Sequence, residues 1–332
     1  MAATKIEWTE VTWNPLVGCS IKSPGCANCY AMRLAHRLAR MRMAKYQKPL
    51  TREIKKGKPV WTGNVYLDEA TLSAPFHWKK PRLVFVNSMS DMAHESLSFE
   101  TIARLFAVMA LTRRHTYQVL TKRPNILRDA VKRLADMNVE ERVRLFVQLA
   151  DEAVHPADMQ LVWPLPNVWL GASVEDQKRA DERREDVRAI ADMGWLTWVS
   201  YEPAIGPVDW TGWEFIRWLV SGGESGPDAR PTHPTWHKSS CDWCLFHGIA
   251  YFLKQWGEWF PDTISNGGIP PFMSAKAKVG VLTWDGRFRA NHIAHEAGEV
   301  TVWKVGKDRA GALLDGREWR QYPSRAMAGA LL

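Results

Sequence analysis

The feature that most constrains the fold is a series of short apolar runs that recur along the chain with helix-like segments between them. A polar or glycine-containing cluster follows each run, and this order is typical of parallel strands joined by crossover helices. The six clearest runs lie at 83–86, 117–120, 168–171, 196–199, 218–221 and 250–253, and a seventh at 11–13 leads into a cysteine loop. The pattern predicts an α/β fold.

Helical segments separate these runs. Those at 98–109 and 175–193 place apolar residues on one face, and a first helix is expected at 27–43. An open doubly wound sheet would use the same strand–loop–helix units. Polar clusters after almost every strand favour a barrel instead, because its active site collects residues from the carboxyl ends of several strands. We therefore expect a partial or complete (β/α) barrel.

The chain changes character after Pro261. A glycine-rich stretch at 265–271 precedes two strand-like pieces at 279–284 and 300–305. We expect residues 1–260 to form the barrel with its cysteine loop, and residues 261–332 to form a small β-containing appendage. The lysine- and proline-rich stretch 46–58 is expected to be a surface insertion after the first helix.

Composition indicates a cytoplasmic protein with no membrane segment. No apolar run approaches the length of a membrane span, and the first fifteen residues lack the apolar region of a secretory signal. Five cysteines form an odd set for disulfides, and close thiols in a reducing compartment are more often metal ligands.

Charge and aromatic content leave the partners open. The formal net charge of +8 favours phosphate-rich partners, nucleic acid among them, without specifying one. The 18 tryptophans could stack on bases if exposed, but most stand in apolar runs, which favours core packing.

The densest set of metal-ligand residues is Cys19-x6-Cys26-x2-Cys29. Pro24 and Gly25 let the backbone turn there so that the three thiols converge. A structural zinc site normally takes four protein ligands, whereas an iron–sulfur cluster with one open iron needs three. Buried free thiols, or a zinc site completed by His36, are the alternatives.

Three glutamates, Glu175, Glu202 and Glu224, end or follow strand-like runs, so a barrel would bring them to one mouth. Each alone could be a capping carboxylate. Lys122 stands at another strand end and could bind an anion, although a solvated loop is the alternative. We take Glu175, Glu202 and Lys122 as candidate catalytic residues. Lys254 follows the last strand, so it is expected to lie near the three glutamates and is a candidate cofactor-binding residue.

A second candidate metal site is Cys241-x2-Cys244, with His233, His237 and His247 nearby. The segment looks helical and its spacing fits no common zinc finger, so packing is the competing interpretation.

Long motifs spread over nearly the whole chain resemble the three-Cys-motif phage protein family, an uncharacterised, radical-SAM-like group of phages and bacteria. The motifs that carry the resemblance are WNPxxGC at 13–19, GCxNCYA at 25–31, FVNSMSD at 85–91, QVLTKRP at 118–124, NVWLGASVE at 167–175, VSYEPAIGPVD at 199–209, SGGESGPDARP at 221–231, FLKQWGEW at 252–259 and LDGREW at 314–319.

The resemblance implies a radical-SAM-type barrel in which Cys19, Cys26 and Cys29 hold a [4Fe–4S] cluster and the fourth iron binds S-adenosylmethionine. It further implies a reductant such as flavodoxin or ferredoxin, and radical chemistry on a substrate that the sequence does not identify. Cofactor or substrate contacts are implied for Asn87, Ser88 and Asp91, and a turn with helix-capping Ser and Asp is the alternative. The triplet Gly222, Gly223 and Glu224 resembles the element that grips the methionine amino group.

Two functional hypotheses follow. The first is a radical-SAM-like iron–sulfur enzyme that cleaves S-adenosylmethionine reductively and acts on an unknown substrate, with nucleic acid as one candidate. The alternative is a non-catalytic zinc-binding module that binds nucleic acid through its basic surface. Iron and sulfide content distinguishes the two.

Overall fold

The computed structural model of the protein describes residues 4–150, 161–262, 277–294 and 296–324. Its centre is a seven-stranded sheet formed by β1 (Val11–Trp13), β6 (Leu83–Val86), β7 (Thr116–Thr121), β8 (Val168–Ser173), β9 (Leu196–Tyr201), β10 (Trp218–Gly222) and β11 (Ala250–Gln255). The strands stand in the sheet in the order in which they occur in the chain, and each pairs in parallel with the next.

The expected α/β class is confirmed, and the barrel is partial. β1 and β11 are the two ends of the strand order, so the curved sheet is open rather than closed. All seven predicted runs are strands, because apolar side chains are buried on both faces of a sheet that has helices outside and aromatic side chains inside.

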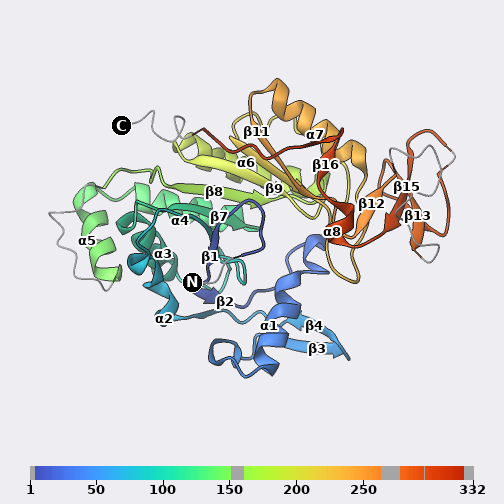
Figure 1. Cartoon of the computed structure of the whole chain (residues 1–332). Helices are drawn as coiled ribbons and strands as arrows, with labels where there is room; N and C mark the ends of the chain where they lie inside the picture. The colour runs from blue at the N-terminus through green and yellow to red at the C-terminus, as the bar shows by residue number, and fades with distance from the viewer. Residues whose placement is uncertain (1–3, 151–160, 263–276, 295, 325–332) are drawn as a thin grey trace.

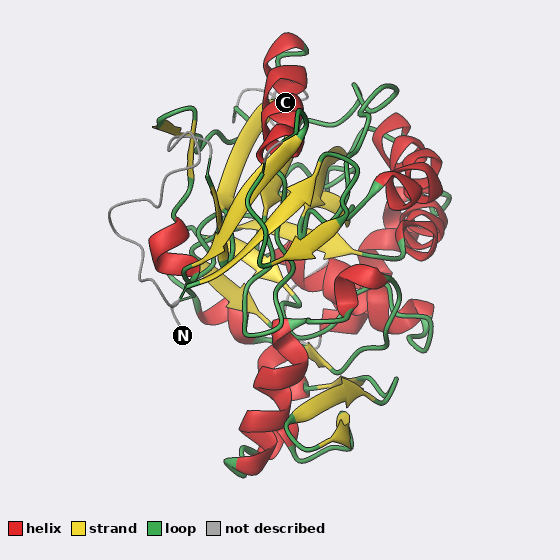
Figure 2. Cartoon of the chain, turned by 90° about the vertical axis from the view of Figure 1, so that its right-hand side faces the viewer, coloured by secondary structure: helices red, strands yellow, loops and turns green. Residues whose placement is uncertain are grey.

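Helices pack against the outer face of this sheet (Figure 2). They are α3 (Phe99–Leu111), α4 (Pro124–Ala135), α5 (Val139–Ala150), α6 (Gln177–Asp192) and α7 (Pro234–Phe246). The side chain of Ser98 accepts a hydrogen bond from the backbone of Thr101 and caps α3, while Asp176 caps α6 in the same way. These caps explain why both helices begin just inside the ranges predicted for them.

α1 (Tyr30–Arg40) is shorter than its predicted range of 27–43. A 3-10 turn, η1 (Pro24–Cys26), occupies the backbone before it. At the other end Arg42 has a φ of 58°, which is outside the helical region. The helix therefore begins immediately after Cys29.

The inner face of the sheet is filled by aromatic side chains. Trp8, Trp169, Trp198 and Trp218 meet there, and edge-to-face contacts join several of them, with the Trp8 and Trp198 ring centroids 5.3 Å apart. Fourteen of the 18 tryptophans are buried. Core packing therefore accounts for most of the tryptophan content.

Gly171 tests how tightly this inner layer is packed. A Cβ atom at residue 171 would lie 2.4 Å from Cε2 of the fully buried Trp198. We expect Gly171→Ala to lower the free energy of unfolding by about 1–3 kcal/mol, because a rigid indole must shift within a packed core. Urea denaturation measures this effect. Gly206→Ala is the matched control, because its Cβ would meet Asp176 at an ordinary 3.4 Å, and an equal loss in both variants would contradict the packing argument.

The part of the chain that connects β1 to β6 forms a second region (Figure 1). It contains a short pair, β2 (Leu16–Val17) with β5 (Tyr66–Leu67), and a hairpin, β3 (Thr51–Lys55) with β4 (Lys58–Trp61), that packs on α1. The short helices η2 (Ala44–Tyr46), α2 (Glu69–Leu72) and η3 (Ala74–His77) complete it. The insertion predicted at 46–58 thus corresponds to most of this hairpin and to the residues that lead into it.

After the barrel the chain forms a small antiparallel sheet of β12 (Trp259–Pro261), β15 (Glu299–Lys304), β13 (Lys278–Thr283) and β14 (Phe288–Ala290), in that order. Both strands predicted in this region are present, while the glycine-rich stretch 265–271 lies outside the described residues. α8 (Lys307–Ala310), β16 (Leu313–Leu314) and β17 (Arg317–Glu318) follow.

Residues 319–321, near the end of the last described segment, return to the open edge of the barrel. Arg320 forms an antiparallel bridge with Phe252 of β11, and Leu253 and Gln321 make backbone hydrogen bonds across the same edge. Residues 319–321 therefore pack on the barrel although they belong to the predicted appendage. The boundary predicted at residue 260 stays a prediction.

A helix long and apolar enough to span a lipid bilayer does not occur in the part of the chain that the structure describes.

Candidate functional site

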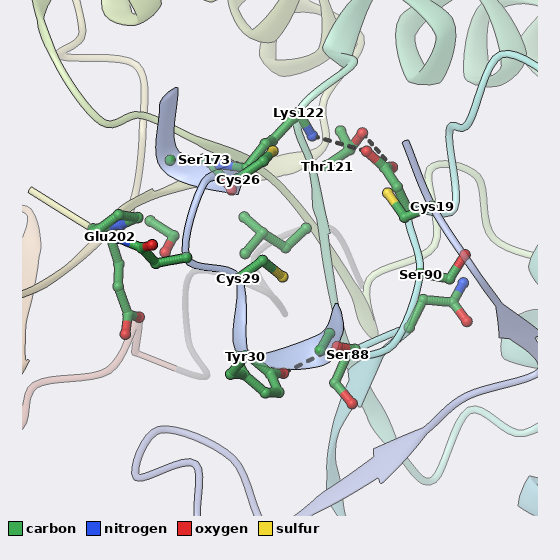
Figure 3. Close-up of a pocket in the computed structure, with 18 of the residues that line it drawn as sticks. Cys19, Cys26, Cys29, Tyr30, Ser88, Ser90, Thr121, Lys122, Ser173 and Glu202 are labelled. Atoms are coloured by element: carbon green, nitrogen blue, oxygen red, sulfur yellow. Dashed lines mark hydrogen bonds between the residues drawn. The ribbon is translucent and has the colours of Figure 1, made fainter. Parts of the chain in front are cut away.

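A cavity of about 220 Å³ lies at the carboxyl ends of the parallel strands (Figure 3). Residues that follow β6, β7, β9 and β10 line its walls, together with the cysteine loop. Trp8, Phe85 and Leu120 contribute an apolar part of the wall, and two of these three belong to the aromatic layer inside the sheet. This position is where barrel enzymes build their active sites.

All three cysteines of the N-terminal loop line this cavity. Gly18 opens the loop with a φ of 96°, and a Cβ atom there would lie 2.1 Å from the carbonyl oxygen of Asn64. Cys26 ends the η1 turn and Cys29 is the N-cap residue of α1. Figure 3 shows the three side chains around one space.

Among the described residues, no three His, Cys, Asp or Glu side chains are grouped as closely as ligands of one metal ion. Thiolates on one zinc ion stand roughly 4 Å apart, given Zn–S bonds of about 2.3 Å. Ligands of an iron–sulfur cluster bind separate irons and stand farther apart. The donor set of three thiols lining one cavity is chemically suited to such a cluster.

Burial controls the ionisation of these thiols. It raises the pKa of Cys19 to about 12, with a further contribution from nearby Asp91. Burial also raises the pKa of Cys29, although the backbone amides of Ala31 and Met32 at the start of α1 act in the opposite direction. The metal-free thiols of Cys19 and Cys29 are therefore protonated at neutral pH, and a bound metal would have to displace these protons.

Three hydrogen bonds tie the cysteine loop to the strand ends. Ser20 accepts a hydrogen bond of 2.6 Å from Arg123 after β7. Ser23 donates one of 2.6 Å to Glu175 after β8, and Asn28 donates one of 3.0 Å to Glu224 after β10. These loop anchors, Ser20, Ser23 and Asn28, flank the three cysteines and set the loop over the cavity.

Glu175 is the most buried of the anchoring groups, with no exposed surface. Its carboxylate pairs with Lys122 and, at 2.9 Å, with Arg183. Burial by itself raises the pKa of Glu175, but Lys122 and Arg183 outweigh it, and the pKa is lowered to about 2. Gly25 packs on this carboxylate so closely that a Cβ atom would lie 2.5 Å from Cγ of Glu175.

Glu224 is held in a similar way. Arg230 binds it through two side-chain nitrogens, at 2.6 and 2.9 Å, and also donates to the carbonyl oxygen of Pro24 in the cysteine loop. Glu224 thus joins the loop after β10 to the segment that carries Cys26 and Cys29.

Asp91 and Arg123 form the third anchored group. Asp91 accepts hydrogen bonds from Thr121 at 2.6 Å and from the backbone of Lys122 at 3.1 Å, and it pairs with Arg123 at 2.8 Å. Arg123 is buried and also pairs with Glu95. The basic pair Lys122 and Arg123 is therefore engaged by carboxylates of the protein itself.

Glu202 and Lys254 form an ion pair of 2.5 Å on the cavity wall, and each side chain is less than a fifth exposed. They come from the ends of β9 and β11, which are not neighbours in the sheet. In the described part of the chain, neither Glu202 nor Lys254 has another side chain as a hydrogen-bond or ion-pair partner. This pair is the most accessible opposite-charge group facing the cavity.

Three residues that line the cavity carry a buried polar atom with no hydrogen-bond partner among the described residues. These atoms are Nε1 of Trp8, Nδ2 of Asn87 and Oγ of Ser90. Asn87 is held in place by its left-handed φ of 60° and by its Oδ1, which accepts from the backbone of Leu16. A polar ligand in the cavity would satisfy such atoms.

The structure brings most of the predicted site residues together. Those that line the cavity are Cys19, Cys26, Cys29, Asn87, Ser88, Asp91, Lys122, Glu202, Gly223, Glu224 and Lys254. Glu175 and Gly222 do not line it. Glu175 lies behind the loop. Gly222 lies beneath Glu202 and Lys254, and a Cβ atom at residue 222 would lie 3.5 Å from atoms of both side chains.

Several lining residues were not predicted. Ser173 and Ser200 lie at the ends of β8 and β9, and the rule that strand ends meet at one mouth could have identified them. Trp8 and Trp61 reach the cavity from the segment before β1 and from β4. No local sequence signal connects these two tryptophans with the site.

Cys241 and Cys244 are buried in the core between α7 and the sheet. His237 contacts Ser221 and, at 2.8 Å, Thr232 through its two ring nitrogens. No three metal-binding side chains are grouped there, and both cysteines are packed as core residues.

The fold and the cavity define an α/β partial-barrel protein with three thiols at its strand-end site. The chain belongs to the family described as protein of unknown function DUF5131, whose model matches residues 3–323. That membership leaves the resemblance to three-Cys-motif phage proteins as a prediction.

Among solved structures, a mutant of spore photoproduct lyase aligns with a TM-score of 0.40 and 8% identity, over 93% of this chain and 72% of that chain. A double mutant of the same enzyme, with bound AdoMet and dinucleoside spore photoproduct, aligns with a TM-score of 0.39 and 10% identity, over 91% and 71%. No curated protein sequence matches. No functional conclusion follows from a likeness of this size.

Proposed function

We propose that the protein is a radical-SAM-like iron–sulfur enzyme. Cys19, Cys26 and Cys29 would hold a [4Fe–4S] cluster, and the cavity beside them would receive S-adenosylmethionine. The observation that carries the proposal is that three thiols of one loop line the same cavity as polar residues from several strand ends. The resemblance to three-Cys-motif phage proteins supports it.

The chemistry that the cofactors supply when bound is one-electron reductive cleavage of S-adenosylmethionine, with a reductant such as flavodoxin or ferredoxin as electron source. The protein's own residues would bind and orient S-adenosylmethionine. The ion pair of Glu202 and Lys254 offers both charges to the amino acid part of the cofactor, and Asn87 and Ser90 offer unpartnered polar atoms. Trp8 provides an apolar wall that excludes water.

The other charged residues act on the protein rather than on a ligand. Glu175, Glu224 and Arg123 bind the loop anchors and keep the cysteine loop over the cavity. Lys122 lines the cavity, and its ammonium binds Glu175, which is fully buried behind the cysteine loop. We propose Glu202 as the carboxylate best placed to exchange a proton with a substrate. A cytoplasmic location is part of the proposal, because the cluster needs a reducing environment.

Anaerobic purification tests the proposed function. Iron and acid-labile sulfide should accompany the chain, and reduction with dithionite in the presence of S-adenosylmethionine should yield 5′-deoxyadenosine and methionine, detected by liquid chromatography. A colourless protein that binds zinc through the same loop, and leaves S-adenosylmethionine intact, would overturn the proposal in favour of a zinc-binding module.

A further inference from the structure

The positive charge of the protein is concentrated in one part of the chain. We define the basic lobe as residues 30–61, which comprise α1, η2 and the β3–β4 hairpin. Between residues 33 and 58 it holds ten lysines and arginines against one acidic residue, Glu53. The whole chain has 44 basic and 36 acidic residues, so the remainder has 34 and 35 and is close to neutral. The excess charge is a property of this lobe.

Most of these cations are exposed and have no carboxylate partner in the described part of the chain. Among the lobe's lysines and arginines, only Arg33 and Lys45 form ion pairs with described residues, namely with Asp228 and Asp68. The other eight are exposed, namely Arg37, Arg40, Arg42, Lys48, Arg52, Lys55, Lys56 and Lys58. Structural ion pairing therefore does not explain why they are gathered here.

The lobe projects from the body of the molecule beside the cysteine loop (Figure 1). A depression lies between α1 and the hairpin, and Arg33, Arg37 and Arg40 line it. The same helix begins immediately after Cys29, and its first residue, Tyr30, lines the cavity with 48% of its surface exposed. Arg33, Arg37 and Arg40 follow Tyr30 along α1 outside the cavity, and Arg33 is paired with Asp228.

We infer that the basic lobe binds the phosphate backbone of a single-stranded nucleic acid and leads one of its nucleotides to the cavity. Clustered lysines and arginines that carry no internal partner are suited to neutralise phosphates, and the exposed ring of Tyr30 offers a base a stacking surface. An enzyme that acts on a base needs it outside a duplex, which favours a single strand. The inference names the substrate class of the proposed function and rests on that function for what happens in the cavity.

An anionic membrane is the competing occupant. The lobe also exposes Met41, Met43 and Ile54, and apolar side chains among cations can insert into a lipid surface. The nucleic-acid strand is favoured because the helix that carries Arg37 and Arg40 starts at the cavity wall with Tyr30, and a substrate must arrive at the cavity.

The test measures binding of the full-length protein to a fluorescein-labelled single-stranded oligonucleotide by anisotropy, over a series of salt concentrations. The lobe variant is Arg37→Glu, Arg52→Glu and Lys56→Glu combined. The control variant is Lys132→Glu, Arg144→Glu and Lys178→Glu combined, which makes the same change in charge on exposed helical positions outside the barrel. Thermal unfolding of both variants checks that they remain folded.

We expect the lobe variant to bind at least about tenfold more weakly, and the salt dependence to lose about 0.7 in slope for each phosphate contact removed. The control variant should bind within about twofold of the unaltered protein. DNA and RNA strands of the same sequence are tested in parallel to show which sugar is preferred. The inference is supported if either strand binds more weakly to the lobe variant than to the control variant.

Equal weakening in both variants would overturn the inference, because the attraction would then come from charge spread over the whole surface. Lobe-dependent binding to phosphatidylserine vesicles, without lobe-dependent binding of the strand, would overturn it in favour of a membrane. Neither result depends on cleavage of S-adenosylmethionine, so failure of the proposed function would be recognised separately by the absence of 5′-deoxyadenosine.

Discussion

Replacement of Cys29 by alanine is expected to remove the iron–sulfur absorbance of the anaerobically purified protein and to reduce 5′-deoxyadenosine formation to background. The cavity offers only three thiols in the described structure, so a cluster that already leaves one iron open would lose a third of its protein ligands. Iron and sulfide analysis, visible absorbance and product chromatography measure the effect.

Cys241→Ala is the matched control for this change. Cys241 is buried in the core between α7 and the sheet and does not line the cavity. The control should keep its iron and its product formation, with at most a modest loss of stability from the smaller side chain. If both alanine variants retained the same amount of iron, the thiol-lined cavity could not be the cluster site.

Replacement of Glu175 by glutamine is expected to lower the free energy of unfolding at neutral pH by about 3–5 kcal/mol, because it leaves Lys122 and Arg183 without their buried counter-charge. Urea denaturation followed by tryptophan fluorescence measures the loss. Glu185→Gln is the control on α6, since that carboxylate is 69% exposed and its removal should change stability by no more than about 0.5 kcal/mol.

The same substitution has a defined pH signature. The pKa of Glu175 is lowered from 4.5 to about 2 in the folded protein. Its stabilising contribution is therefore complete above pH 4.5 and is lost as the pH falls toward 2, where the folded protein also takes up the proton. The stability difference between the unaltered protein and Glu175→Gln should shrink over this range. A difference that stayed constant down to pH 2 would contradict the assigned ion pairs.

The strands of the barrel could be predicted from the sequence because each has a local signature. Runs such as 83–86 and 168–171 are continuously apolar since both of their faces are covered, and a polar loop follows each at the carboxyl end. Closure of the barrel has no such signature. It depends on whether β1 and β11 meet, and these strands are separated by most of the chain.

The candidate site could be predicted only in part, for a related physical reason. Residues at strand ends such as Glu202 and Lys254 share a cavity because parallel strands present their ends at one edge. Glu175 also follows a strand end, but its side chain contacts Ser23 and Arg183 instead of lining the cavity. Those contacts depend on how side chains pack in three dimensions, which the position along the strand does not reveal. Likewise, the motif at 314–319 precedes Arg320, which bridges to the edge strand β11. The amino-acid sequence of the motif does not indicate that β11 lies beside it.

The three anchors of the cysteine loop bear on how the proposed cluster would be loaded. Ser20, Ser23 and Asn28 are fastened to strand ends by hydrogen bonds between protein groups. If the proposed cluster is bound, it would enter a site whose loop these bonds already position. Its insertion would then be a step separate from the folding of the chain.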